Sequence, residues 1–277
     1  MQFPKIIFTI YQEHQWLDKI IEEYKIDAVI SDNRVGLYSN KIHSVYITHQ
    51  LLIKTGNNFT ERIASKIHHH FINKYDECWV PDFALNSLAG KLSHPAKLSR
   101  KIKYIGALSR FELQEHTEKK YDLLISISGP EPQRTIFEDQ ILNDLKSYSG
   151  KVLLIRGLPG NKKLLHNHSI KIKDHLSAKQ LNEVMLQSAM IIARCGYTTI
   201  MDLVKLKKKA ILIPTPGQAE QEYLAKYLLE KKIFYTVEQT NFSLQKDLQQ
   251  EASMHFNIPE YDMEQYKKVI NQFVLSL

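Results

Sequence analysis

The amino-acid sequence predicts an α/β protein built of two consecutive parallel-sheet domains that face a cleft. Short apolar runs typical of buried strands alternate with helix-patterned segments along the whole chain. A polar, aperiodic stretch at 109–120 interrupts this alternation and is typical of a linker. The 277 residues are enough for two domains of about 100–200 residues each. We therefore expect a first domain at 1–108, a linker at 109–120, a second domain at 121–258 and a closing helix at 259–277.

The first domain is expected to alternate helices and strands. Helices are predicted at 4–24 and 59–75, and strands at 26–31 and 44–48, with further strands in the runs ECWVP and KIKYIGAL. Polar side chains follow two of these strands, with Asp32 after the first and His49 after the second. Because parallel strands end at one edge of a sheet, both side chains are expected at the same edge.

The second domain repeats the alternation. Strands are predicted at YDLLISIS, KVLLIRG, AMIIA, AILIPTP and IFYTV, with helices at 132–148 and 177–187 between them and a helix at 262–275 after them. Within 189–223, a buried strand turns sharply at Gly196 into a helix, and a neighbouring strand ends in a polar loop. Helix amino termini beside strand ends bind anions, so this stretch is the expected site.

Composition narrows the class of protein. The net charge of +7 and the pI near 9.1 are compatible with a protein that binds nucleic acid, an anionic membrane surface or a phosphorylated small molecule. Basic residues are dense only at 205–209, a predicted solvated helix end, so we do not expect nucleic-acid binding. No apolar run approaches about 18 residues and no signal-peptide cleavage site is evident, which favours a cytoplasmic protein. Cys78 and Cys195 are expected to be buried, reduced thiols.

The runs RCGYTTIMDL and PTPGQAEQEY resemble the donor-sugar motif of glycosyltransferases with the GT-B fold, in particular the family 28 carboxyl-terminal domain. The motif places an acidic residue six positions after its glycine, and Asp202 stands six positions after Gly196. The second run ends in Gln221, Glu222 and Tyr223, where the family has Gln-Gln-Tyr. The resemblance covers 121 to about 237 and implies two Rossmann-like domains and a UDP-sugar as substrate, with no cofactor and no metal.

The resemblance assigns donor-binding roles to several residues. Asp202 would hold the ribose hydroxyls, since a carboxylate can accept two hydrogen bonds from a diol; the alternative is a capping box within its own helix. Gln218, Gln221 and Glu222 would meet the donor sugar, the alternative being an ordinary first helical turn. Glu222 replaces a glutamine of the family, which leaves the sugar open.

The resemblance also gives candidate ligands for the diphosphate and for the uracil base of the nucleotide. Gly196 and Thr198 would bind the diphosphate, and Arg194, which opens the motif, is counted with them; a plain tight turn is the alternative. The loop SGPEPQR matches the phosphate loop of the family, where Gly129 and Arg134 are the candidates. Arg134 would face the diphosphate or pair with Glu138 at i+4. Leu176 lies where the family holds uracil.

The first half resembles the acceptor domain more loosely. Such domains begin with a strand and a glycine-rich loop that carries a histidine, and residues 1–108 contain no such segment. We therefore expect the first domain to be partial, either because the numbering begins late in a longer protein or because the domain is reduced. His49 is the candidate base, with Asp32 behind it; a structural histidine is the alternative.

These observations predict an inverting, metal-independent glycosyltransferase that uses a UDP-sugar. A nucleotide-sugar hydrolase or epimerase of the same fold is an alternative, and so is a non-catalytic nucleotide-sugar-binding subunit. The apolar first helix and the positive charge permit a lipid-linked acceptor and peripheral contact with the inner face of a membrane, although a soluble acceptor is equally consistent.

Overall fold

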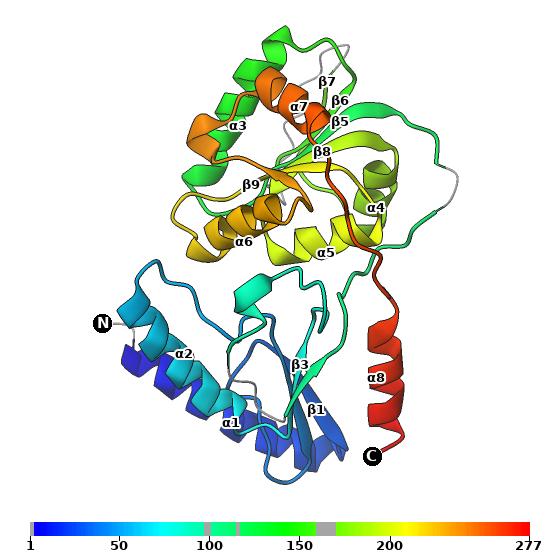
Figure 1. Ribbon diagram of the computed structural model, residues 1–277. Coiled ribbons are helices and arrows are strands. Elements are labelled where there is room, and N and C mark those ends of the chain that lie inside the picture. Colours follow the sequence, from blue (N-terminus) through cyan, green and yellow to red (C-terminus); the bar gives the residue numbers. More distant parts are fainter. Residues whose placement is uncertain (1–2, 97–100, 115–116, 159–169) are drawn as a thin grey trace. The chain divides into compact units, whose positions relative to one another are not determined.

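A computed structural model describes residues 3–96, 101–114, 117–158 and 170–277 (Figure 1). The chain divides into two compact units, the first formed by Met1–Ala107 with Tyr261–Leu277 and the second by Leu108–Glu260. Residues of the 109–120 stretch that the structure describes pack on the second unit. Phe111 is buried there, and the backbone amide of Glu112 donates to Asn182 Oδ1 at 2.7 Å.

The first unit is a four-stranded parallel sheet of order β1-β2-β3-β4. Its strands and helices agree with the predicted ones to within a few residues. Asn57 fixes the start of the second helix, because its side chain accepts hydrogen bonds from the amides of Phe59 and Thr60. The elements are α1 (Phe3–Tyr24), β1 (Ala28–Asp32), β2 (His43–Ile47), α2 (Asn58–Ile72), β3 (Glu77–Val80) and β4 (Ile102–Tyr104).

The predicted closing helix is α8 (Gln265–Val274), and it packs on the first unit although it ends the chain (Figure 1). Phe273 anchors it, with its ring 5.2 Å from that of Trp79 between centroids, edge to face. Gln265 adds a hydrogen bond of 2.9 Å to the carbonyl of Tyr104. The first unit is therefore discontinuous in sequence.

The second unit is a six-stranded parallel sheet of order β10-β9-β8-β5-β6-β7. The central pairing of β8 with β5 and β9 places two strands predicted as neighbours side by side. One apolar core cluster includes Leu123, Phe137, Ile192 and Ile211. The strands are β5 (Tyr121–Ser126), β6 (Val152–Ile155), β7 (Ile170–Lys173), β8 (Ser188–Arg194), β9 (Ala210–Ile213) and β10 (Tyr235–Thr236).

Among the described residues, four α-helices connect these strands and a fifth, α7, follows the last one: α3 (Gln133–Asp144), α4 (Ala178–Leu186), α5 (Tyr197–Lys205), α6 (Ala219–Glu230) and α7 (Leu244–Ser253). A capping box between Ser177 and Gln180 starts α4. Helix α7 was not predicted, because LQKDLQQEAS is mostly polar. Tertiary contacts order it: Asp247 is buried and accepts hydrogen bonds from the Tyr235 hydroxyl at 2.8 Å and from the amide of Ser243 at 2.7 Å.

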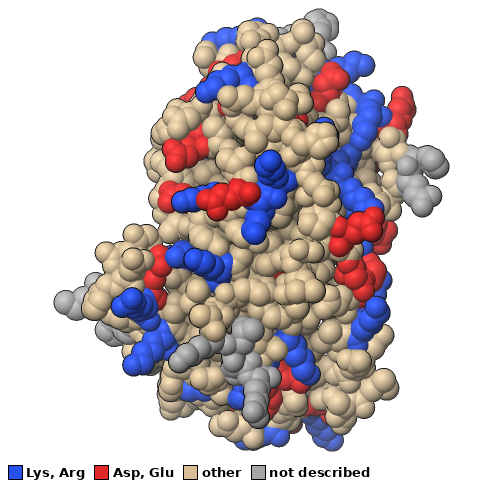
Figure 2. All heavy atoms as spheres, viewed as in Figure 1, with Lys and Arg blue, Asp and Glu red and all other residues tan. Residues whose placement is uncertain are grey.

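Charges lie in small mixed groups on the face drawn in Figure 2. Cys78 and Cys195 are free and buried, as predicted. No helix in the described part of the chain is long and apolar enough to cross a membrane. One expectation was wrong: the 205–209 run is not fully solvated. Lys208 is 7% exposed, and its ammonium donates to the carbonyls of Leu186 at 2.7 Å and Ser188 at 3.0 Å.

The buried Lys208 predicts a pH-dependent stability. Burial, together with the nearby ammonium of Lys119, lowers the pKa of Lys208 from 10.5 to about 7. Between these two pKa values the unfolded chain binds more protons than the folded chain, so the free energy of unfolding should rise with pH from about 7 towards 10.5. Lys208→Met should flatten this rise by up to about 1.4 kcal/mol per pH unit. Urea unfolding at pH 7, 8 and 9 measures it, and the exposed Lys226→Met should keep the wild-type slope.

Candidate functional site

The candidate site lies at the carboxyl edge of the second sheet, where the central strands end. Strands β5, β8 and β9 are neighbours and parallel, so the loops that follow them emerge at one edge. These loops are 127–132, 195–196 and 214–218. They contain Gly129, Gly196 and Gln218, and α5 and α6 start directly after two of them. The structure thus brings the strand-end residues of the predicted motif to one edge.

Gly196 begins α5 and leaves its amino terminus uncovered. It is the N-cap residue, with φ −83° and ψ 144°, and no side chain caps the helix. A Cβ at this position would have Thr199 Oγ1, 3.9 Å away, as its nearest neighbour. The protein itself therefore does not need glycine here for backbone conformation or for space. What the glycine provides is access to the first-turn amides, which attract anions. Thr198, in the same turn, is exposed.

Arg194 lies beneath this edge and binds backbone rather than solvent. Its side chain is 2% exposed, and the guanidinium stacks 4.3 Å from the centroid of the Phe137 ring. It donates to the carbonyls of Ser128 at 3.3 Å, Gln133 at 3.0 Å and Pro214 at 3.4 Å. Burial lowers its pKa to about 10, so it stays charged at neutral pH. Arg194 was predicted as a donor ligand; the structure makes it the group that ties three segments of the site together.

Asp202 lies on α5 below Gly196 and is 8% exposed. The Ser109 hydroxyl donates to its Oδ1 at 2.6 Å, whereas Oδ2 has no hydrogen-bond partner among the described residues. Burial raises the pKa of Asp202, and the Ser109 hydrogen bond opposes that shift. The alternative of a capping box that begins at Thr199 does not hold, because the N-cap position of α5 is Gly196 and the Asp202 carboxylate accepts a hydrogen bond from Ser109 instead. Ser109 stood in the predicted linker, and no sequence pattern marked it.

The loop at 214–218 is braced by the first turn of α6. Gln221 Oε1 accepts a hydrogen bond of 2.9 Å from the amide of Thr215, and its Nε2 donates to Gln218. Glu222 Oε1 accepts one of 2.8 Å from the amide of Gly217, whose φ of +81° suits glycine. Gln221 and Glu222, two of the three side chains predicted to meet a sugar, hold the loop in this structure. This agrees with the alternative of an ordinary first helical turn.

Thr215 is a further polar group at this edge that the sequence analysis missed. It is 1% exposed, and its Oγ1 has no hydrogen-bond partner in the described structure. A buried hydroxyl without a partner costs about 1–3 kcal/mol, so such groups mark places where a partner is absent. Gly129, from the β5 loop, has φ +107°, and a Cβ there would lie 3.4 Å from Thr215 Oγ1. Glycine therefore keeps space open beside this hydroxyl.

Arg134 lies in a buried ionic cluster at the ends of β6 and β7. Its Nη1 donates to Glu138 Oε2 at 2.5 Å and its Nε to Glu131 Oε1 at 2.6 Å. Arg156 also pairs with Glu138, and with Asp174 Oδ1 at 3.0 Å. Of the two alternatives predicted for Arg134, the structure shows the pairing with Glu138, and the residue is 6% exposed.

The remaining candidates also lie at strand ends. Leu176 is 7% exposed and follows β7 at the carboxyl edge of the second sheet, just before α4. In the first unit, Asp32 ends β1 and is exposed, while His49 follows β2 by two residues and is half-buried. Strands β1 and β2 are parallel, with Asp32 opposite Ile47, so Asp32 and His49 share one sheet edge, as predicted.

Comparison with known proteins shows what most of the second unit, together with α8, is similar to. Residues 140–274 match the sequence model of the glycosyltransferase family 28 C-terminal domain. A segment is 34% identical over 93 residues to the UDP-N-acetylglucosamine--N-acetylmuramyl-(pentapeptide) pyrophosphoryl-undecaprenol N-acetylglucosamine transferase of Rickettsia prowazekii (strain Madrid E). That match covers 29% of this chain and 24% of the Rickettsia protein.

Solved structures extend the likeness to nearly the whole chain. The kitacinnamycin glycotransferase matches with a TM-score of 0.63 and 12% identity, over 92% of this chain and 75% of its own. The UDP-GlcNAc 2-epimerase of Methanocaldococcus jannaschii, in complex with UDP-GlcNAc and UDP, matches with a TM-score of 0.62 and 12% identity, over 96% of this chain and 80% of its own. At such identities these structures show the fold alone. The chain therefore has the GT-B fold, and its residues 140–274 match the glycosyltransferase family 28 C-terminal domain.

Proposed function

We propose that this protein is an inverting, metal-independent glycosyltransferase that moves a sugar from a UDP-sugar to an acceptor hydroxyl. The observation that carries the proposal is one helix with two features: α5 has an uncovered amino terminus at Gly196 and a buried carboxylate at Asp202. The first suits a diphosphate and the second a ribose diol. The family 28 domain and the Rickettsia relative support this donor class.

The residues of the second unit would act on the leaving group. As the bond between the sugar C1 and the diphosphate oxygen breaks, negative charge grows on the diphosphate. The α5 amides stabilise that charge, and the buried guanidinium of Arg194 adds positive potential from below. Asp202 Oδ2 accepts from the ribose while Ser109 holds Oδ1, which fixes the orientation of the carboxylate. Thr215 Oγ1 offers a donor to the bound nucleotide-sugar.

The first unit would supply the base. The acceptor oxygen bonds to the sugar C1 on the face opposite the leaving group, and its proton must move to a protein group. Histidine can accept a proton near neutral pH, and His49 is such a group at a strand end, with Asp32 at the same sheet edge. These assignments extend the donor-side proposal to the whole reaction.

Titration with UDP tests whether Asp202 binds the donor nucleotide. Asp202→Ala should weaken UDP binding at least about tenfold, because the charge-assisted hydrogen bonding of the ribose to Asp202 Oδ2 is lost. Ser109→Ala should weaken binding less, since it releases the carboxylate without removing it. Asp139→Ala removes an exposed acid from α3 and should leave the affinity unchanged. Unchanged affinity in Asp202→Ala would remove the ribose assignment.

A nucleotide-sugar epimerase or hydrolase is the second candidate, since the Methanocaldococcus jannaschii 2-epimerase matches the fold as well as the glycotransferase does. Incubation with sugar-labelled UDP-N-acetylglucosamine separates the classes. Label in a glycoside only when an acceptor is present indicates transfer; an altered UDP-sugar indicates epimerisation, and free sugar indicates hydrolysis. UDP binding without any product, with or without an acceptor, would indicate a non-catalytic nucleotide-sugar-binding subunit.

We further place the reaction at the cytoplasmic face of a membrane, with a lipid-linked acceptor. The name of the Rickettsia relative includes a pyrophosphoryl-undecaprenol compound. In this chain, α2 carries an exposed apolar stripe of Phe59 (71%), Ile63 (46%) and Ile67 (37%). The exposed Arg62 and Lys66 lie on the same helix, a combination typical of helices at anionic membrane surfaces. Offering lipid-diphosphate and soluble acceptors in the labelled assay distinguishes the two acceptor classes.

A further inference from the structure

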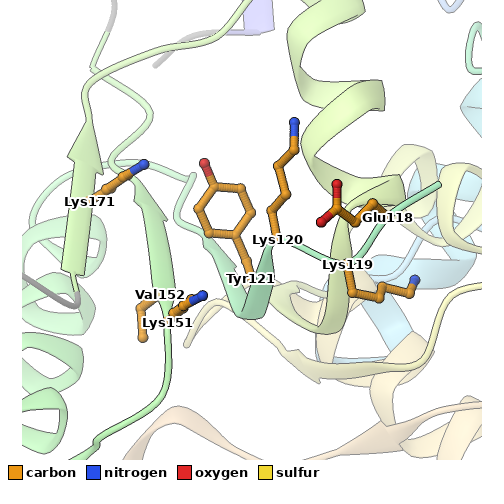
Figure 3. Close-up of a pocket in the computed structure, with 7 residues that line it drawn as sticks. All are labelled: Glu118, Lys119, Lys120, Tyr121, Lys151, Val152 and Lys171. Carbon is orange, nitrogen blue, oxygen red and sulfur yellow. The ribbon is translucent and has the colours of Figure 1, made fainter.

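A cavity rich in lysines lies in the second unit, at the edge of the sheet opposite the candidate donor site. A cavity of about 380 Å³ opens where β5, β6 and β7 begin. Because all strands of this sheet are parallel, their first residues lie at the amino edge, away from the carboxyl edge where Gly196 and Thr215 lie. The cavity is lined by Glu118, Lys119, Lys120, Tyr121, Lys151, Val152 and Lys171 (Figure 3).

The charge in this cavity is strongly unbalanced. Four of its seven lining residues are lysines and one is a glutamate. Lys119 is already engaged: its ammonium points away from Tyr121 in Figure 3 and donates to the carbonyls of Leu186 at 3.1 Å and Ser188 at 3.2 Å. For Lys120, Lys151 and Lys171, the described structure contains no ion pair with a carboxylate. Like charges that share a cavity repel one another, and a bound anion would relieve that repulsion.

Three of the lining residues lie on or next to strands of the sheet. Tyr121 is the first residue of β5, and Lys171 extends towards it, with its ammonium 6.0 Å from the centroid of the ring. Lys151 precedes β6, and its backbone amide donates to Asp122 Oδ2 at 2.7 Å, which fixes the entry of that strand. Figure 3 shows Lys171 and Lys120 on opposite sides of the Tyr121 ring, with Lys151 near its base. The arrangement therefore presents ammonium groups around one phenol.

We propose that this cavity binds a phosphate-bearing anion, at a site separate from that of the donor nucleotide. A phosphate group offers several acceptor oxygens and up to two charges, which suits separate ammonium donors better than the single charge of a carboxylate does. The Tyr121 hydroxyl adds a neutral donor. The volume of about 380 Å³ fits a small phosphorylated molecule or a lipid headgroup rather than a nucleic-acid strand, which needs an extended basic track.

Inorganic pyrophosphate is the probe for a soluble ligand, titrated by calorimetry into the full chain with saturating UDP present to occupy the other edge. The double variant Lys151→Gln/Lys171→Gln should weaken pyrophosphate binding about five- to tenfold, since two partly exposed ion contacts are lost. The matched control, Lys226→Gln/Lys246→Gln, removes two exposed lysines from α6 and α7 and should bind as the wild type does. Lys151→Gln/Lys171→Gln is called the pocket variant below. Equal midpoint temperatures of thermal unfolding for the two double variants show that the pocket variant is folded.

Vesicles separate a lipid source from a soluble one. Co-sedimentation with phosphatidylglycerol vesicles, compared with phosphatidylcholine vesicles, is measured for the same variants. Pyrophosphate binding that depends on the two lysines, without loss of vesicle binding in the pocket variant, assigns a soluble ligand. Phosphatidylglycerol binding that falls in the pocket variant and is displaced by pyrophosphate assigns a headgroup. If the pocket variant matches the control in both assays, the proposal is overturned.

Discussion

Gly196→Val is expected to reduce UDP binding by at least about thirtyfold while leaving the protein folded. The φ and ψ of Gly196 lie in the extended region, which valine adopts readily, and the nearest atom to a new Cβ is 3.9 Å away. The protein therefore has room for the side chain. The branched methyl groups would stand over the first-turn amides of α5, where the diphosphate is proposed to bind, and would exclude it.

The measurement pairs UDP titration with urea unfolding. The free energy of unfolding should change by less than about 1 kcal/mol, because no cap interaction is lost. Gly196→Ala is the matched comparison at the same position, since its single methyl group covers the first-turn amides less and should weaken UDP binding less than valine does. A Gly196→Val protein that binds UDP as the wild type does would show that the diphosphate lies elsewhere.

Arg194→Met should cost about 2–4 kcal/mol in the free energy of unfolding and should also weaken UDP binding. Three backbone carbonyls, of Ser128, Gln133 and Pro214, would lose their donor, at about 1–3 kcal/mol each. Relief from burying an arginine offsets part of that loss, since burial alone lowers its pKa to about 10. Methionine retains much of the packing on Phe137.

Arg194→Lys separates the charge from the geometry. Lysine keeps the positive potential, but one ammonium cannot reproduce the planar fork that reaches three segments. If geometry dominates, both variants lose stability and the affinity for UDP. If charge dominates, the lysine variant binds UDP nearly as the wild type does. If Arg194→Met has the same free energy of unfolding as the wild type, Arg194 does not link the segments of the site as described.

Elements with strong apolar periodicity could be predicted, and those held by polar contacts could not. The helix at 4–24 and the strands that form β5, β8 and β9 carry their own pattern, because each buries an apolar face. Helix α7 lacks that pattern; its order depends on Asp247, whose partners include Tyr235 on another element. Likewise, Lys208 lies in a charged run that is typical of a solvated helix end, yet it is buried because its ammonium donates hydrogen bonds to two backbone carbonyls.

The sequence by itself determined the local part of the site: a glycine that opens a helix after a buried strand, an acid six residues on, and a loop after the next strand. These features depend on spacing along one short stretch, which lies within the residues that match the family 28 C-terminal domain, 140–274. Only the tertiary structure decided what each side chain does. Ser109 orients Asp202, and the backbone carbonyls of Ser128, Gln133 and Pro214 bind Arg194. Such contacts join residues through folding, so no periodicity or spacing encodes them.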